Sequence, residues 1–201
     1  MQFNSAIFIG AVTAALSVPA SAAIVASATT PLNIRSGPGP QYGVIGAIPD
    51  RGQATIIGCI QGSLWCQVSY NGKQGWAYSQ YMTATLSGRS LAVAEMRDLP
   101  PVQAPAEVVG SAVAAPVITD TLVEPAAGQP LVITPPPAVG SYVVSHPVAP
   151  VYLNGEVVTG SGLPDNVPLS GVPGYDYEYA YVNRVPVLVE PSTRQVVYVY
   201  R

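Results

Sequence analysis

Short apolar runs separated by turn residues fill the first part of the chain, residues 26–86. Gly, Pro or Asn-Gly stands in nearly every gap between these runs, which is the pattern of consecutive strands joined by tight turns. The candidate strands are Leu32 to Arg35, Val44 to Ala47, Ala54 to Ile60, Leu64 to Tyr70 and Gly75 to Tyr78. Five short strands in about 60 residues predict a small β-barrel.

Strand signals return after Ser141. Asn154-Gly155 separates two apolar runs, residues 151–153 and 156–158, as in a two-residue hairpin. Tyrosines at every second position then predict a strand with four rings on one face; they are Tyr175, Tyr177, Tyr179 and Tyr181. Two more runs, residues 186–190 and 195–200, complete a predicted three-stranded meander. The Tyr face is a candidate surface for a second partner or for self-association.

Residues 87–140, between these two β regions, are rich in Pro, Ala and Val and have few aromatic residues. Residues 91–97 are long enough for a helical turn or two, which Pro100 and Pro101 end. The rest has no sustained hydrophobic period, so we predict an extended, largely disordered linker.

The N-terminus has the pattern of an export signal. Residues 6–18 form an apolar run, and Ala20-Ser21-Ala22 supplies an A-x-A cleavage pattern, so we predict a signal peptide over residues 1–22. The alternative is an uncleaved anchor, because the first five residues contain no Lys or Arg and the low polarity continues through Ala26. With cleavage, the protein is periplasmic or secreted and has no integral membrane span.

The composition narrows the function classes. Only 9% of the 201 residues are charged, and the chain contains 21 Pro and 19 Gly, which disfavours long helices and one large enzyme domain. The net charge is −3, and Lys73 is the only lysine. Nucleic acid is therefore not an expected partner, since phosphate binding needs clustered cations.

Catalytic and metal-binding candidates are weak. His146 is the only histidine and precedes a proline, so we interpret it as an exposed loop residue. Asp176 and Glu178 are two residues apart on one strand face, which is typical of a solvated face rather than a glycosidase pair. Gly37 and Gly39 lack the third glycine and the strand-to-helix context of a phosphate loop. We expect no enzymatic activity, no metal and no cofactor.

Cys59 and Cys66 are the only cysteines, and they flank the turn at residues 61–64. In a four-residue hairpin loop these positions face each other, with Cβ atoms about 4.5–5.5 Å apart. In an oxidising compartment this predicts a disulfide. A free thiol pair and a metal site are the alternatives, the latter weakened by the lack of a second Cys pair or clustered His.

Two turns define the barrel sequence further. Gly37-Pro38-Gly39-Pro40 predicts a sharp reversal, because Gly permits a positive φ while Pro fixes its own. Arg35, just before it, can reach back to carbonyls of the reversal or point to a ligand carboxylate. Asn71-Gly72 predicts a second hairpin.

These motifs resemble a known family. The run from Leu32 to Gly39 (LNIRSGPG), followed by Tyr42, Val44-Ile45-Gly46, Gly75-Trp76 and Tyr81, is similar to the bacterial SH3-like domain over about residues 26–84. The resemblance implies an SH3-like barrel domain, residues 26–86, of an envelope or secreted protein. Some members bind cell-wall peptides or glycan as targeting modules beside hydrolases. Residues 141–201 resemble a short module of alphaproteobacterial envelope proteins whose function is unknown.

The expected function is therefore non-enzymatic binding of cell-wall peptidoglycan, peptide or glycan, or of an envelope protein. Aromatic rings stack on sugars and extended peptides, so Tyr42, Trp65 and Tyr81 are the candidate ligand contacts, with Arg35 as a carboxylate partner. The alternative is a structural or assembly protein that acts through β pairing with other proteins and binds no small ligand.

Overall fold

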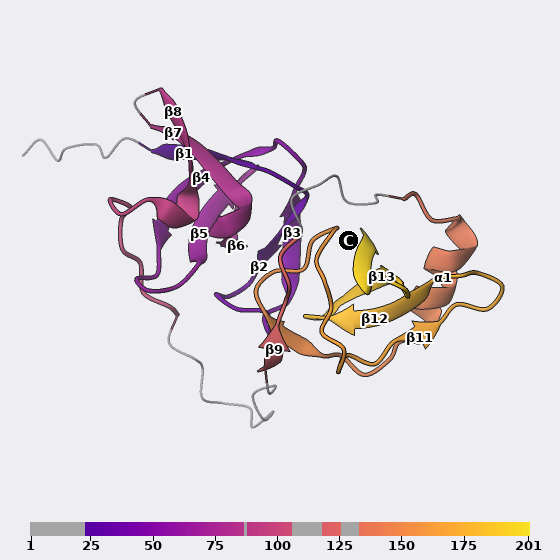
Figure 1. Ribbon diagram of the computed structural model, residues 1–201. Coiled ribbons are helices and arrows are strands. Elements are labelled where there is room, and N and C mark those ends of the chain that lie inside the picture. The colour runs from indigo at the N-terminus through magenta and orange to yellow at the C-terminus, as the bar shows by residue number, and fades with distance from the viewer. Residues whose placement is uncertain (1–22, 87, 106–117, 126–132) are drawn as a thin grey trace, which may run out of the picture.

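The computed structural model describes residues 23–86, 88–105, 118–125 and 133–201. The predicted signal peptide, residues 1–22, lies outside them. The fold is mainly β, as predicted: an eight-stranded sheet forms the N-terminal barrel, and a four-stranded sheet forms the C-terminal module beside it (Figure 1). A two-stranded sheet adjoins the module. None of the helices in the described residues has the length and apolarity that a membrane span requires.

The barrel contains all five predicted strands, within a residue or two, and three more. Its strands are β1 (Ile24–Ala28), β2 (Leu32–Arg35), β3 (Val44–Ile48), β4 (Gln53–Cys59), β5 (Trp65–Tyr70), β6 (Lys73–Tyr78), β7 (Met82–Leu86) and β8 (Arg89–Ala92). The order β3-β2-β6-β5-β4-β1-β7-β8 places β1 between β4 and β7. The predicted Asn71-Gly72 hairpin is confirmed, because both residues have positive φ and Tyr70 pairs with Lys73.

The chain between the two β regions is not one linker. After the 3₁₀ turn Val93–Glu95, the Cys59 amide donates to the Pro100 carbonyl and the Val102 amide to the Cys59 carbonyl. Met96, Leu99 and Val102 pack against the barrel core. Residues 88–102 thus belong to the barrel, although Pro and Ala mask these apolar contacts in the sequence. Residues 106–117 and 126–132 lie outside the described part.

The C-terminal meander is confirmed and extended by one strand. Its antiparallel order is β11 (Ser170–Gly171), β12 (Glu178–Val182), β13 (Val185–Glu190) and β14 (Gln195–Val199). The hairpin predicted at Asn154-Gly155 is wrong. β10 (Tyr152–Asn154) pairs in parallel with β9 (Ile118–Thr121), and Gly155, at φ +102°, turns the chain away instead.

Both faces of this sheet are covered. Along β13, Val187 and Val189 pack into one apolar cluster and Leu188 into another on the opposite face. Helix α1 (Pro137–Ser145) buries Val139 and Val143 in the second cluster. The predicted linker boundary at residue 140 therefore cuts through a helix that belongs to the module.

The Tyr face is a packing surface, contrary to the expectation of an open one. Tyr179 is buried and donates its hydroxyl hydrogen to the His146 carbonyl at 2.8 Å, and Tyr181 donates to the Val143 carbonyl at 3.1 Å. Tyr175 alone of the four is 40% exposed. His146 follows α1, and its ring stacks on Tyr142 with centroids 4.1 Å apart.

Candidate functional site

Arg35 ends β2 and lies under the Gly-Pro reversal. Its Nη1 donates to the carbonyls of Pro40 at 3.1 Å and Tyr42 at 2.7 Å, so the reversal holds one side of the guanidinium. The glycine in the reversal serves a purpose other than the predicted one. The φ of Gly37 is not positive, but a Cβ there would lie 2.3 Å from the Tyr42 ring. Close approach of the ring requires Gly37.

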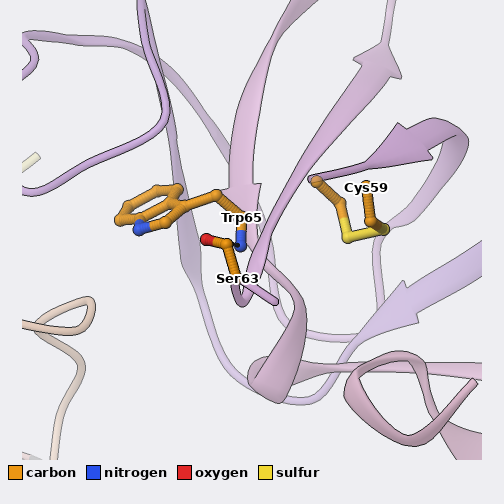
Figure 2. The surroundings of a disulfide bond; sticks show 4 residues. Cys59, Ser63 and Trp65 are labelled. Carbon is orange, nitrogen blue, oxygen red and sulfur yellow. Dashed lines mark hydrogen bonds between the residues drawn. A yellow bond between two sulfur atoms is a disulfide. The ribbon is translucent and has the colours of Figure 1, made fainter. Parts of the chain in front are cut away.

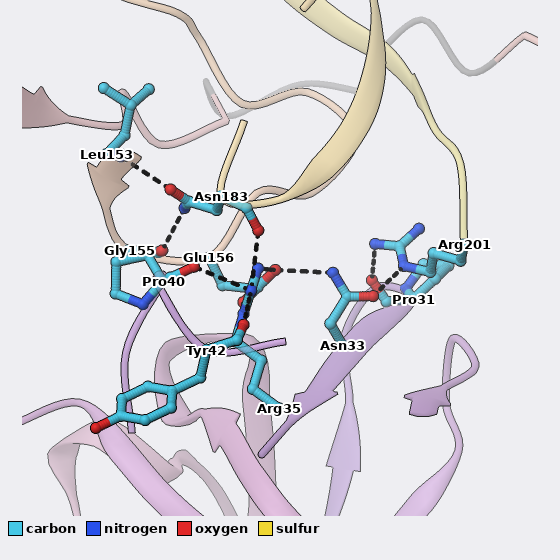
Figure 3. A network of polar contacts seen from close by, with 10 residues as sticks. All are labelled: Pro31, Asn33, Arg35, Pro40, Tyr42, Leu153, Gly155, Glu156, Asn183 and Arg201. Atoms are coloured by element: carbon cyan, nitrogen blue, oxygen red, sulfur yellow. Dashed lines mark hydrogen bonds and ion pairs between the residues drawn. The ribbon is translucent and has the colours of Figure 1, made fainter. Parts of the chain in front are cut away.

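The other side of the guanidinium meets a carboxylate from the C-terminal module. Nη2 of Arg35 donates to Oε1 of Glu156 at 2.8 Å, and Nε donates to Oε2 (Figure 3). Both side chains have 0% exposure. The Asn33 amide also donates to Oε1 of Glu156, at 2.8 Å. The pair is a bidentate, fully buried ion pair between the two modules.

Asn183 fixes the geometry on the module side. It begins the two-residue turn Asn183-Arg184 between β12 and β13, where both residues have positive φ. Its carbonyl accepts a bond from Nη1 of Arg35 at 3.0 Å. Its side chain donates to the Gly155 carbonyl at 3.0 Å and accepts from the Leu153 amide at 2.8 Å. The residue before Glu156 is thereby tied to the meander.

Arg201 extends this network toward the barrel's first turn. Its Nε donates to Oδ1 of Asn33 at 2.9 Å, and its Nη2 donates to the Pro31 carbonyl at 2.7 Å. Burial lowers the pKa of Arg201, and the nearby Glu156 carboxylate opposes that shift. The last residue of the chain is thus part of the contact between the modules.

A row of rings lines the same side of the barrel. Trp65 and Tyr78 meet edge to face at 5.3 Å between centroids, and Tyr81 lies 6.0 Å from Tyr78. Burial raises the pKa of Tyr81 to about 12; the Glu124 carboxylate adds to the shift, and a hydrogen bond with Ser161 opposes it. Glu124 and Ser161 follow the barrel in the chain, so the Tyr81 ring faces that later part of the protein.

The four predicted ligand residues therefore do not form an open surface. Arg35 is fully buried and Trp65 is 5% exposed, while Tyr42 and Tyr81 are half-buried. The structure brings Arg35 and Tyr42 together but places the C-terminal module over the guanidinium. Sequence reasoning missed Glu156 and Asn183. The turn residues around them were the only local sign of a special role.

The predicted disulfide is confirmed. Cys59 and Cys66 pair across the β4–β5 hairpin and are joined by a disulfide. The Trp65 ring points away from this bond, and the Trp65 amide donates to the Ser63 hydroxyl oxygen at 3.3 Å (Figure 2). The hairpin loop is therefore held both at its base and within its turn.

A groove of about 620 Å³ opens beside this loop. One wall is the loop itself, and the other is the segment that follows β8. In Figure 1 that segment lies on the side of the barrel away from β12 and β13. Ile60, Leu64, Met96 and Leu99 give it half-buried apolar walls, and Gln61, Ser63 and Arg97 add exposed polar groups. Its described lining contains no aromatic ring.

Within the described ranges, no group of three or more His, Cys, Asp or Glu side chains is placed to hold a metal ion. The groove can offer hydrogen bonds, a guanidinium and apolar area to a ligand. Its chemistry is therefore that of a binding surface.

The fold and these sites define a two-module β protein built on an SH3-like barrel. Residues 30–83 match the bacterial SH3 domain family, and residues 142–201 match a domain of unknown function, DUF1236. The chain thus contains a bacterial SH3 domain followed by a DUF1236 domain.

One curated relative is similar over part of its length. It is the Bacillus subtilis (strain 168) protein named "Putative N-acetylmuramoyl-L-alanine amidase YrvJ", with 39% identity over 71 residues. The similar region is 35% of this chain and 13% of that protein. The similarity thus spans only a small part of that protein's length.

Proposed function

We propose that the protein is an exported, non-enzymatic protein of the cell envelope whose barrel binds a cell-wall peptide. The observation that carries this proposal is the bacterial SH3 domain at residues 30–83. The partial relative, whose name describes an amidase of the N-acetylmuramoyl-L-alanine linkage, supports the same setting. The disulfide is consistent with export, because such bonds persist in oxidising compartments.

The groove beside the disulfide is the proposed recognition surface. It offers an exposed cation, Arg97, beside half-buried apolar side chains, and a guanidinium pairs well with a peptide carboxylate. Sugar recognition relies on aromatic stacking, and no ring lies among the described lining residues. We therefore favour the peptide part of the wall over the glycan.

Sedimentation of the mature chain with purified cell-wall sacculi tests this function. Wild type and Arg89→Gln should pellet with the sacculi, whereas Arg97→Gln should pellet about tenfold more weakly, because it loses a charged hydrogen bond. Arg89 is a matched control, since it is an exposed arginine of the same module that does not line the groove. A wild-type chain that stays in the supernatant would contradict the proposal.

The alternative, a structural protein that pairs its strands with other proteins, is favoured by one observation. β3 is an edge strand of the barrel sheet and has the uncharged sequence VIGAI. Val44 is 37% and Ile45 42% exposed. Exposed apolar edges without charges are sites of strand addition. If the wild-type chain does not pellet with sacculi, this structural role is supported. If it pellets and Ile45→Lys pellets equally well, this role is opposed.

A further inference from the structure

The Arg35 side of the barrel binds a carboxylate. The carbonyls of Pro40 and Tyr42 belong to the barrel and hold Nη1 of Arg35, which fixes the plane of the guanidinium. The Nε and Nη2 edge is left for a partner outside the barrel. Such an edge matches the two oxygens of one carboxylate. We call Asn33, Arg35 and these two carbonyls the Arg35 face.

The C-terminal module presents a group that fits this face. The Glu156 carboxylate meets both Nε and Nη2 of Arg35 and also accepts from Asn33. Its position depends on Asn183, which binds the Gly155 carbonyl and offers its own carbonyl to Arg35. Two turns of the module, at residues 154–156 and 183–184, thus converge on one guanidinium.

Among the described residues, the buried apolar side chains of the barrel form one cluster, and those of the module form two others. The contacts that join them at the Arg35 face are hydrogen bonds and one ion pair. Polar interfaces between separately cored units resemble those between independent proteins. In this respect the contact at Arg35 resembles one between two independent proteins.

We propose that the DUF1236 module is a docking domain for a bacterial SH3 barrel. It recognises the Arg35 face through Glu156 and occupies the place that another molecule's carboxylate would otherwise take. Its partner is a barrel whose arginine edge is held by carbonyls of its own Gly-Pro reversal, here within the same chain. This assigns a binding role to the module and reserves the Arg35 face for it.

Hydrogen exchange of the mature full chain, measured by mass spectrometry, tests the docking. Glu156→Gln places an amide hydrogen against the guanidinium, so it should speed exchange about tenfold in residues 31–42 and 182–184, while β5 and residues 187–190 of β13 stay protected. Asp165→Asn is the matched control. It removes a fully exposed carboxylate of the same module, paired with Arg194 at 3.6 Å, and should change neither segment. Wild-type exchange in Glu156→Gln would overturn the proposal.

Arg201→Ala keeps the test decisive if Glu156→Gln fails to fold. Arg201 is the terminal residue of the chain and bonds to Asn33 and Pro31 of the barrel. Its loss should speed exchange in residues 31–35 and leave the rest of the barrel unchanged. Unchanged exchange in residues 31–35 would overturn the proposal. Neither measurement involves cell-wall material, so the docking can fail or succeed independently of the proposed wall binding.

Discussion

Arg35 shows how one side chain can serve both its own turn and a distant module. The guanidinium bonds to two carbonyls of the adjacent reversal and to a carboxylate 121 residues away in sequence. A buried ion is costly without a partner, whereas a buried, fully bonded pair is close to neutral against apolar residues of similar size. Removing one partner should therefore lower the free energy of unfolding by more than the intact pair raises it relative to apolar residues.

A double-mutant cycle measures that asymmetry. Glu156→Ala should lower the free energy of unfolding by about 3 kcal/mol, because Arg35 loses its buried partner. Adding Arg35→Met should recover part of this loss, since no unpaired charge remains. Urea denaturation of the four proteins gives the coupling energy. Strictly additive losses would show that the two side chains do not act as a pair.

Because of Tyr81, we expect the free energy of unfolding to fall at alkaline pH. Its pKa is raised to about 12 by burial, with Glu124 adding to the shift, so the folded protein favours the neutral phenol. The contribution of this residue is fully present below pH 10, the pKa of an unfolded tyrosine, and is lost as pH rises toward 12. Denaturant unfolding from pH 9 to about 11.5 should show this decline.

Tyr81→Phe should flatten that decline, because phenylalanine cannot ionise. Tyr175→Phe is the control, since Tyr175 is 40% exposed and lies at the surface of the other module. A Tyr81→Phe curve parallel to wild type across this range would contradict the assignment.

At the scale of elements, the β4–β5 hairpin combines a disulfide with one wall of the proposed groove. Cys59 and Cys66 close an eight-residue loop, for which chain entropy predicts about 2.5 kcal/mol of stabilisation. For a small barrel this is a large share of its stability. The same bond holds the loop that contributes Gln61 and Ser63 to the groove.

Removing the disulfide should therefore lower thermal stability and loosen the groove. Cys59→Ala/Cys66→Ala should reduce the melting temperature by several degrees, as should a reducing agent on wild type. Circular dichroism measures both. A melting temperature unchanged by reduction would show that the bond contributes nothing to stability.

The elements predicted well from sequence are those with local causes. β2, the Asn71-Gly72 turn and the Cys59–Cys66 pair follow from strand pattern, positive-φ residues and loop length within about ten residues. β1 was missed because its residues continue the apolar N-terminal run, and its pairing with β4 and β7 is non-local. Asn154-Gly155 has good hairpin chemistry, but the chain pairs β10 with β9 instead.

At the scale of the molecule, the sequence predicts two modules but not their contact. The sequence indicates that Arg35 can meet a carboxylate, and it does. Which carboxylate it meets depends on how two separately folded units approach, and no local pattern contains that information. The ligand surface was consequently predicted on the Arg35 side, where the C-terminal module lies. The groove beside the disulfide is lined in part by Val93, Ala94, Met96, Arg97 and Leu99, in a segment whose composition is typical of a linker.

We propose that the barrel has two separate binding surfaces, one for its own C-terminal module and one for the cell wall. Sacculus sedimentation of Arg97→Gln and Glu156→Gln, side by side with wild type, distinguishes the two surfaces. Arg97→Gln should bind about tenfold more weakly, and Glu156→Gln should bind as wild type does. Stronger binding by Glu156→Gln together with unchanged binding by Arg97→Gln would contradict this proposal, and would place the wall site at the Arg35 face.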